Sequence, residues 1–81
     1  MRLDKFLKVT RIIKRRTIAQ ELCDAKNVKV NGDAKKPSYE VKKGDNLEIK
    51  YYSNIIKAKV LEIPKEALKK EQISEYISFI N

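Results

Sequence analysis

The sequence contains no histidine and only one cysteine among its 81 residues. Histidine is the side chain that most often acts as a general base near neutral pH, so the commonest kind of acid–base active site is excluded. A single cysteine cannot form an internal disulfide, and it cannot supply the four Cys or His ligands of a structural zinc site. The sequence therefore predicts neither a metal site nor another cofactor.

Long apolar segments are also missing. No uninterrupted apolar run exceeds two residues, whereas a membrane-spanning helix needs about 20. The first residues do not form an apolar signal segment, so we expect a cytoplasmic protein that does not contact a membrane. A chain of 81 residues holds one small domain. This length excludes a separate catalytic domain, and we do not expect an enzyme.

Basic residues are abundant and unevenly distributed. Lys and Arg number 19 against 11 Asp and Glu, which gives a formal net charge of +8 and favours a polyanionic partner. Residues 1–16 alone carry seven basic side chains and one carboxylate, a net charge of +6, whereas residues 62–81 have a net charge of −1. The surface that meets the partner is therefore expected in the N-terminal part.

A solvated basic face that only keeps the protein soluble is the alternative interpretation of this cluster. Four of the seven basic residues in it are arginines. The planar guanidinium fork binds phosphate with two hydrogen bonds and stacks on bases, and solubility requires neither property. The arginine content therefore favours a binding surface.

Two helices are expected in this basic part. Apolar residues recur every three or four positions from Leu3 to Ile13 and predict a helix over residues 2–11. Thr17 and Gln20 have the spacing of a capping box, so a second helix is expected to begin there and to end near residues 26–27. Residues 14–16 then lie in the joint before its N-terminus, where free N–H groups and the helix dipole favour a phosphate.

Alternating apolar residues predict three short strands, over residues 28–30, 47–51 and 56–60, with a tight turn at Asn31-Gly32. Ile73, Tyr76, Ile77 and Ile80 have helical spacing and predict a last amphipathic helix of roughly ten residues. The predicted fold class is α+β, with two helices on a small antiparallel sheet. We expect a domain over residues 1–63 and a helical tail over residues 64–81.

Five segments resemble, in order and spacing, the S4 domain, an RNA-binding module named after a protein of the small ribosomal subunit. They are residues 2–7 (RLDKFL), 14–19 (KxRTxA), 28–32 (VKVNG), 36–38 (KPS) and 41–45 (VKKGD). The resemblance extends over residues 2–51. Among stand-alone members the chain is most similar to the RqcP (YabO) group of ribosome-associated quality control factors, and the fifteen-kilodalton heat-shock protein group is the alternative.

This resemblance implies a function in RNA binding. Members of the RqcP group bind the large ribosomal subunit obstructed by peptidyl-tRNA. They contact rRNA and hold the P-site tRNA while an RqcH-type factor directs alanine tailing of the stalled nascent chain. The alternative group recycles blocked large subunits. A ribosome-associated monomer is expected.

The RNA-binding face that the resemblance implies combines the basic cluster with nearby polar residues. Its members are Arg2, Asp4, Lys5, Lys8, Arg11, Lys14, Arg15, Arg16, Thr17, Gln20, Lys29 and Asn31.

Asp4 is the exception in this set, because a carboxylate repels phosphate. It either orients a neighbouring arginine such as Arg16 or accepts a hydrogen bond from a base edge or a 2′-OH. A plain i,i+4 pair with Lys8, worth a few tenths of a kcal/mol, is the alternative interpretation.

Five further residues are interpreted individually. Cys23 is expected to be a small buried side chain without redox function. Lys26 stands where the family commonly has glycine, so Asn27 is expected to adopt the left-handed conformation that ends the second helix. Strand alternation places Tyr51 in the core and Tyr52 outward, where Tyr52 is a minor candidate for RNA contact.

A protein-interaction module is the competing hypothesis, in which the apolar stripe of the last helix docks on a partner. An enzyme ranks third, since S4 domains are often appended to pseudouridine synthases and tRNA synthetases, but nothing in this sequence would form such an active site.

Overall fold

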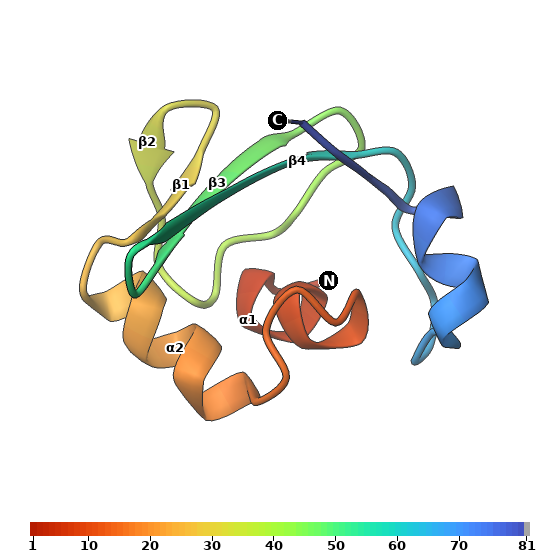
Figure 1. Cartoon of the computed structure of the whole chain (residues 1–81), viewed down its shortest axis with the longest axis horizontal. Helices are drawn as coiled ribbons and strands as arrows, with labels where there is room; N and C mark the ends of the chain where they lie inside the picture. Colours follow the sequence, from red (N-terminus) through yellow and green to blue (C-terminus); the bar gives the residue numbers. More distant parts are fainter. Residues whose placement is uncertain (81) are drawn as a thin grey trace.

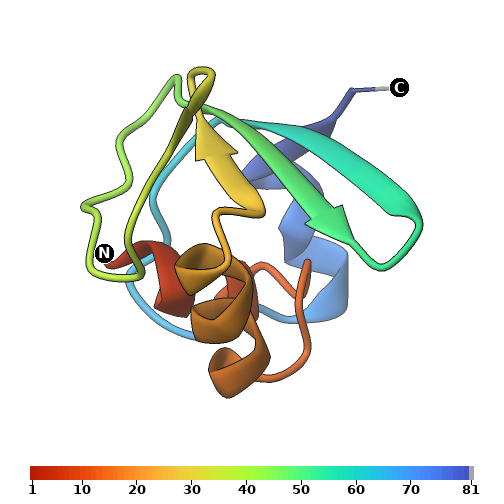
Figure 2. The same cartoon turned by 90° about the vertical axis from the view of Figure 1, so that its left-hand side faces the viewer.

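Residues 1–80 are described by a computed structural model, in which two helices lie on one side of a five-stranded sheet (Figures 1 and 2). The helices are α1 (Leu3–Val9) and α2 (Arg16–Asp24). The strands are β1 (Val28–Val30), β2 (Asp33–Ala34), β3 (Asn46–Tyr51), β4 (Asn54–Val60) and β5 (Ile77–Phe79), with a 3-10 helix, η1 (Lys70–Glu75), before β5. The α+β fold class is confirmed.

All strand pairings are antiparallel, in the order β2-β1-β3-β4-β5 across the sheet. Val30 of β1 pairs with Leu47 of β3, which in turn pairs with Ala58 of β4. These three side chains are buried, whereas Lys29 and Lys57, one position away, are exposed. Because alternate residues of a strand point to opposite faces, the sheet has one apolar face toward the helices and one polar face toward solvent.

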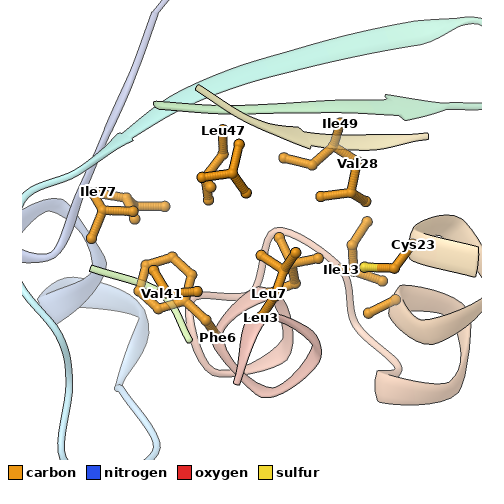
Figure 3. Packing of buried hydrophobic residues seen from close by; sticks show 13 residues of the cluster. Leu3, Phe6, Leu7, Ile13, Cys23, Val28, Val41, Leu47, Ile49 and Ile77 are labelled. Atoms are coloured by element: carbon orange, nitrogen blue, oxygen red, sulfur yellow. The ribbon is translucent and has the colours of Figure 1, made fainter. Parts of the chain in front are cut away.

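The core lies between α1 and the apolar face of the sheet (Figure 3). Leu3, Phe6 and Leu7 of α1 have no exposed surface and point toward Leu47 and other apolar side chains of the sheet. Full burial of one such side chain stabilises the fold by about 1.5–3 kcal/mol. The apolar spacing predicted for the first helix is therefore confirmed, although the helix ends at Val9.

The start of α2 differs from the prediction. The helix begins at Arg16, Arg15 occupies the N-cap position without a side-chain hydrogen bond, and Thr17 lies in the first turn. Gln20 donates its side-chain N–H to Asp4 instead of closing a capping box. The cap predicted at Thr17 is wrong because a helix begun at Arg16 puts Arg16 and Gln20, four residues apart, on the same face toward a buried carboxylate.

The end of α2 corrects a second expectation. Lys26, with φ 61°, adopts the left-handed conformation that was expected at Asn27. The N–H of Lys26 donates to the carbonyl of Cys23 (3.0 Å), and the N–H of Asn27 donates to that of Leu22 (2.9 Å). These two hydrogen bonds are those of a Schellman motif, which places the left-handed residue two positions after the last helical one.

The C-terminal helix predicted through Ile80 is wrong in its second half. Lys70–Glu75 form η1, but Ile77–Phe79 form β5, which pairs with β4 and buries Ile77 in the core. Four apolar positions do not distinguish a helix from a strand, and β4 offers an unpaired edge whose N–H and C=O groups β5 satisfies. Asn81, the last residue of the predicted tail, lies outside the described residues.

Lys26→Gly is expected to raise the free energy of unfolding by about 0.5–1 kcal/mol, because glycine adopts a positive φ without strain. Lys29→Gly, which removes the same charge from the middle of β1, is the control and should lower the stability by a similar amount. Urea unfolding monitored by circular dichroism measures both changes. A Lys26→Gly variant less stable than the natural chain would contradict the assignment.

Candidate nucleic-acid interface

Asp4, in the first turn of α1, is the centre of the basic N-terminal region. Its side chain has 0% exposed surface, although basic residues surround it. Arg16 donates from Nε at 3.1 Å, Gln20 from Nε2 at 2.9 Å and Arg2 from Nε at 3.2 Å. The backbone N–H of Lys5, the fourth residue to donate to this carboxylate, lies at 2.8 Å. The buried carboxylate is thus bound by donors from α1, from α2 and from the residue before α1.

The two arginines are held at Asp4 and remain accessible. The side chain of Arg2 is 50% exposed and that of Arg16 is 41% exposed. Each uses Nε and Nη2 toward the carboxylate, which leaves further N–H donors of each guanidinium for a ligand. A guanidinium fixed in this way loses less side-chain entropy when it binds a phosphate, so the carboxylate prepares both arginines for an anion.

The pKa of Asp4 reflects this surrounding. Burial acts to raise the pKa, but the hydrogen bonds from Gln20, Arg16 and the N–H of Lys5 outweigh it and lower the pKa below the ordinary value. The carboxylate therefore stays charged wherever the protein is folded near neutral pH.

The structure selects among the interpretations of Asp4. Its orientation of Arg16 is confirmed. The i,i+4 ion pair between Asp4 and Lys8 is not found in the described residues 1–80, where Arg2 and Arg16 are the partners of Asp4. A carboxylate without exposed surface is not positioned to accept a hydrogen bond from a base edge or a 2′-OH. Its contacts to Arg2 and Arg16 are the route by which it would affect a ligand.

A wide groove next to this cluster gathers more basic side chains. Its volume is about 810 Å³, and it lies between the helical region and the segment 65–68. Apart from Val9, Glu66, Ala67 and Leu68, its lining residues are basic: Lys5, Lys8, Arg11, Lys14, Arg16 and Lys65. We call this surface, together with Arg2, the basic groove. Its dimensions and charge suit a phosphate backbone.

Lys65 was not predicted to belong to the site. It lies about fifty positions after the basic cluster, in a segment with a net negative charge. No sequence motif and no local excess of basic residues indicated that Lys65 belongs to the site. Only the path of the chain after β4 brings Lys65 to the basic groove, which it lines together with Lys5 and Lys8.

Other predicted site residues lie elsewhere. Arg15 and Thr17 are exposed near the start of α2, and Gln20 is half-buried and donates to Asp4. Lys29 is exposed between the buried Val28 and Val30, so it lies on the solvent face of the sheet. Asn31 donates to the Asp45 carboxylate (3.1 Å) and accepts from the N–H of Asn46 (2.9 Å). The structure therefore does not bring Lys29 and Asn31 together with the basic groove.

Asp45 is a second buried carboxylate, and it has a structural function. It accepts hydrogen bonds from the Tyr39 hydroxyl (2.9 Å), the N–H of Lys42 (2.9 Å) and the Asn31 side chain. Burial and the hydrogen bond to Asp45 raise the pKa of the Tyr39 hydroxyl. The segment between β2 and β3 is thereby fixed to the turn between β1 and β2.

Cys23 is buried, as expected, with 3% of its surface exposed. Burial, with the nearby charges of Asp4 and Asp24, raises the pKa of its thiol to about 11, so the nucleophilic thiolate is scarce at neutral pH.

Within residues 1–80 no group of three or more His, Cys, Asp or Glu side chains is placed to hold a metal ion. None of the helices in this range has the length and apolar character needed to span a membrane.

Comparison with known proteins gives consistent results. The family model of the S4 domain matches residues 1–47. Two relatives are both named RQC P-site tRNA stabilizing factor. That of Listeria monocytogenes is 46% identical over 80 residues, covering 99% of this chain and 86% of the relative. That of Streptococcus pneumoniae is 46% identical over 81 residues, covering 100% and 91%.

A solved structure supports the fold. The trimeric heat shock protein 15 of Vibrio cholerae superposes with a TM-score of 0.90 over 99% of this chain and 81% of the other. Because the two sequences are only 22% identical, this similarity concerns the fold alone.

Asp4→Asn is expected to lower the free energy of unfolding at pH 7 by about 1–3 kcal/mol, because the two arginines lose their charged partner. The lowered pKa also predicts a pH dependence. The stability from the charged carboxylate is fully present above the unfolded pKa of about 3.9 and is lost as the pH falls through the folded pKa. Urea unfolding between pH 7 and pH 3 should therefore show a smaller loss of stability in the variant.

Glu48→Gln is the matched control for this measurement. Glu48 is partly exposed, and its carboxylate lies 3.9 Å from Lys57 Nζ, a weak surface pair. Its variant should keep the pH dependence of the natural chain. Equal pH dependence in the natural chain and in Asp4→Asn would exclude the proposed effect of Asp4.

Proposed function

Because the chain belongs to the S4 domain family, and within it to the group of relatives named RQC P-site tRNA stabilizing factor, we propose that it is a non-catalytic RNA-binding factor of ribosome-associated quality control. The observation that carries this proposal is the basic groove, in which two arginines, Arg2 and Arg16, are fixed on Asp4.

The geometry favours recognition of the RNA backbone. Six arginine and lysine side chains line the groove against one carboxylate, Glu66, and the nearby carboxylate of Asp4 is buried beneath Arg2 and Arg16. Cations placed in this way neutralise phosphates and release counterions, whatever the base sequence. Contacts to phosphate position a protein on RNA, and the shape of the folded RNA then determines where several contacts form together. The proposed ligand is therefore structured RNA.

The finer proposal concerns the site of action. The relatives' names refer to P-site tRNA, and the family resemblance implies binding to the large subunit obstructed by peptidyl-tRNA. We propose that the basic groove binds rRNA and P-site tRNA on that subunit. There the protein stabilises the tRNA while an RqcH-type factor adds alanine to the stalled chain. The protein is then cytoplasmic, ribosome-associated and without catalytic activity of its own.

Two alternatives remain part of the proposal. Subunit recycling, as in the heat-shock group, is compatible with the shared fold. The Vibrio cholerae protein is trimeric in its structure, so a monomer stays a proposal here.

The hypothesis of a protein-interaction module loses its basis. It depended on an apolar stripe along a C-terminal helix, but Ile77–Phe79 form a strand and Ile77 is in the core.

Lys14→Ala and Arg16→Ala should each weaken binding to large subunits and reduce the slope of log K against log salt concentration by roughly one unit, because each removes about one phosphate contact. Lys14 tests the groove without disturbing the contacts of Asp4. Lys59→Ala, which removes one charge from the solvent face of the sheet, is the matched control and should not change the slope. Co-sedimentation at several salt concentrations measures these effects. Unchanged co-sedimentation of both groove variants would exclude this surface.

The finer proposal predicts the content of the ribosomal peak. In cells lacking the natural protein, the tagged chain should sediment with large subunits that carry peptidyl-tRNA, whereas Arg16→Ala should leave less peptidyl-tRNA there. Sucrose gradients followed by gel detection of peptidyl-tRNA check this. If the tagged chain sediments with subunits free of peptidyl-tRNA, the recycling alternative is favoured.

A further inference from the structure

The turn between β3 and β4 contains an unusual residue. Tyr51 pairs with Asn54, so Tyr52 and Ser53 form a two-residue hairpin loop. Tyr52 has φ 57° and is 80% exposed, the most exposed large apolar side chain among residues 1–80. Positive φ is typical of Gly, Asn or Asp in such loops, and a bulky residue there is strained. Neither core packing nor turn geometry accounts for a tyrosine at this position.

The ring of Tyr52 has a defined position. Its centroid lies 4.6 Å from that of Tyr51, with an angle of 65° between the ring planes, an edge-to-face contact. Tyr51 is half-buried and packs against the core. The edge-to-face contact thus holds the exposed ring of Tyr52 against an anchored neighbour and leaves much of its surface open.

Two adjoining grooves extend from this ring toward the basic N-terminal region. One, of about 490 Å³, lies between the hairpin tip and α2 and is lined by Tyr51, Tyr52 and Ile18 among others. The next, of about 400 Å³, is lined by Lys14 and Arg15 and shares Tyr51 and Ile18 with the first. The tip of the β3–β4 hairpin lies beside the end of α2 in Figure 1, and the second groove extends from Tyr51 to the α1–α2 connection.

An exposed aromatic ring beside cations is suited to unpaired nucleotides. Aromatic side chains stack on bases of any sequence, while nearby Lys and Arg bind the phosphates. The grooves contain the basic residues Arg11, Lys14, Arg15 and Lys50, and Glu21 is the only acidic residue lining them. This excess of positive charge favours RNA over a protein segment as the occupant.

We propose that Tyr52 is a stacking site for an unpaired nucleobase, with Lys14 and Arg15 binding the adjoining phosphates. This proposal rests on RNA binding by the chain and adds a feature of the RNA: a looped-out or single-stranded nucleotide next to the structured part that the basic groove holds. The chain thereby distinguishes RNA with an exposed base from a continuous duplex.

The test uses two RNA probes and the full chain at one fixed salt concentration. The first probe is a uridine hexamer with one central 2-aminopurine, whose fluorescence falls when the base stacks on an aromatic ring. The second is a blunt twelve-base-pair RNA duplex without unpaired bases. Binding of each is followed by fluorescence anisotropy, and stacking in the hexamer by quenching.

Tyr52→Ala is expected to weaken hexamer binding about tenfold and to abolish the quenching, while duplex binding changes less than twofold. Tyr52→Phe should bind as the natural chain does, because stacking does not need the hydroxyl. Tyr52→Gly relieves the positive φ, so it should match or exceed the natural melting temperature and still lose hexamer binding. Ile55→Ala, at another exposed apolar residue of the same hairpin, is the matched control and should leave both probes unaffected.

Hexamer binding and quenching that persist in Tyr52→Ala and Tyr52→Gly would overturn the stacking site. The stacking site would also be overturned if these variants bound both RNAs normally and lost only their association with a protein. A different result would contradict the general RNA-binding proposal: Arg16→Ala would then leave duplex binding unchanged.

Discussion

The buried carboxylate of Asp4 is the constraint on which the N-terminal half of the structure depends. An ionised group without solvent contact requires several donors, and those donors come from Arg2, Lys5, Arg16 and Gln20. Satisfying it fixes the distance between α1 and α2 and the rotation of α2 about its axis. The same contacts bring guanidinium groups to the surface, so one interaction both connects the helices and prepares the binding face.

This arrangement resolves an electrostatic conflict. Several cations within one turn of a helix repel one another and destabilise the fold, whereas a carboxylate among them would repel the ligand if it were exposed. Burial beneath the arginines lets Asp4 offset the repulsion between cations while the outer surface remains positive. The depth of the negative charge below the protein surface therefore matters as much as its position in the sequence.

Local patterns predicted the elements whose stability is local or whose faces are strongly amphipathic. The apolar positions of α1, the alternation in β1, β3 and β4 and the turn at Asn31-Gly32 all correspond to the structure. The prediction failed where a distant partner decides the outcome. Gln20 has the spacing of a capping box with Thr17, but its side chain donates to Asp4, sixteen residues earlier. Ile77 has helical spacing to Ile73 and Ile80, but it lies in a strand and pairs with Val60. Tertiary contacts override propensity at such positions.

The candidate site follows the same rule. Residues of the first sixteen positions were predictable because they are close in sequence and share a helix and its joint. Charge suggested that Asp4 orients Arg16 but left two other interpretations open, and only the structure selects among them. Lys65 was not predictable, because the return of the chain after β4 is set by packing. Lys29 and Asn31 were assigned through the family pattern, yet the structure places one on the solvent face of the sheet and uses the other to hold a loop.

The short strand β5 also bears on aggregation. Without it, β4 would present a seven-residue open edge containing Ile55, Ile56 and Val60, a template for pairing with another chain. With β5 in place, Ala58, Lys59 and Val60 are paired, so the open edge of β4 is shortened to residues 54–57, and β2 at the other edge has only two residues. Three residues near the end of the described chain thereby shorten the edge that this sheet offers to the strand of another molecule.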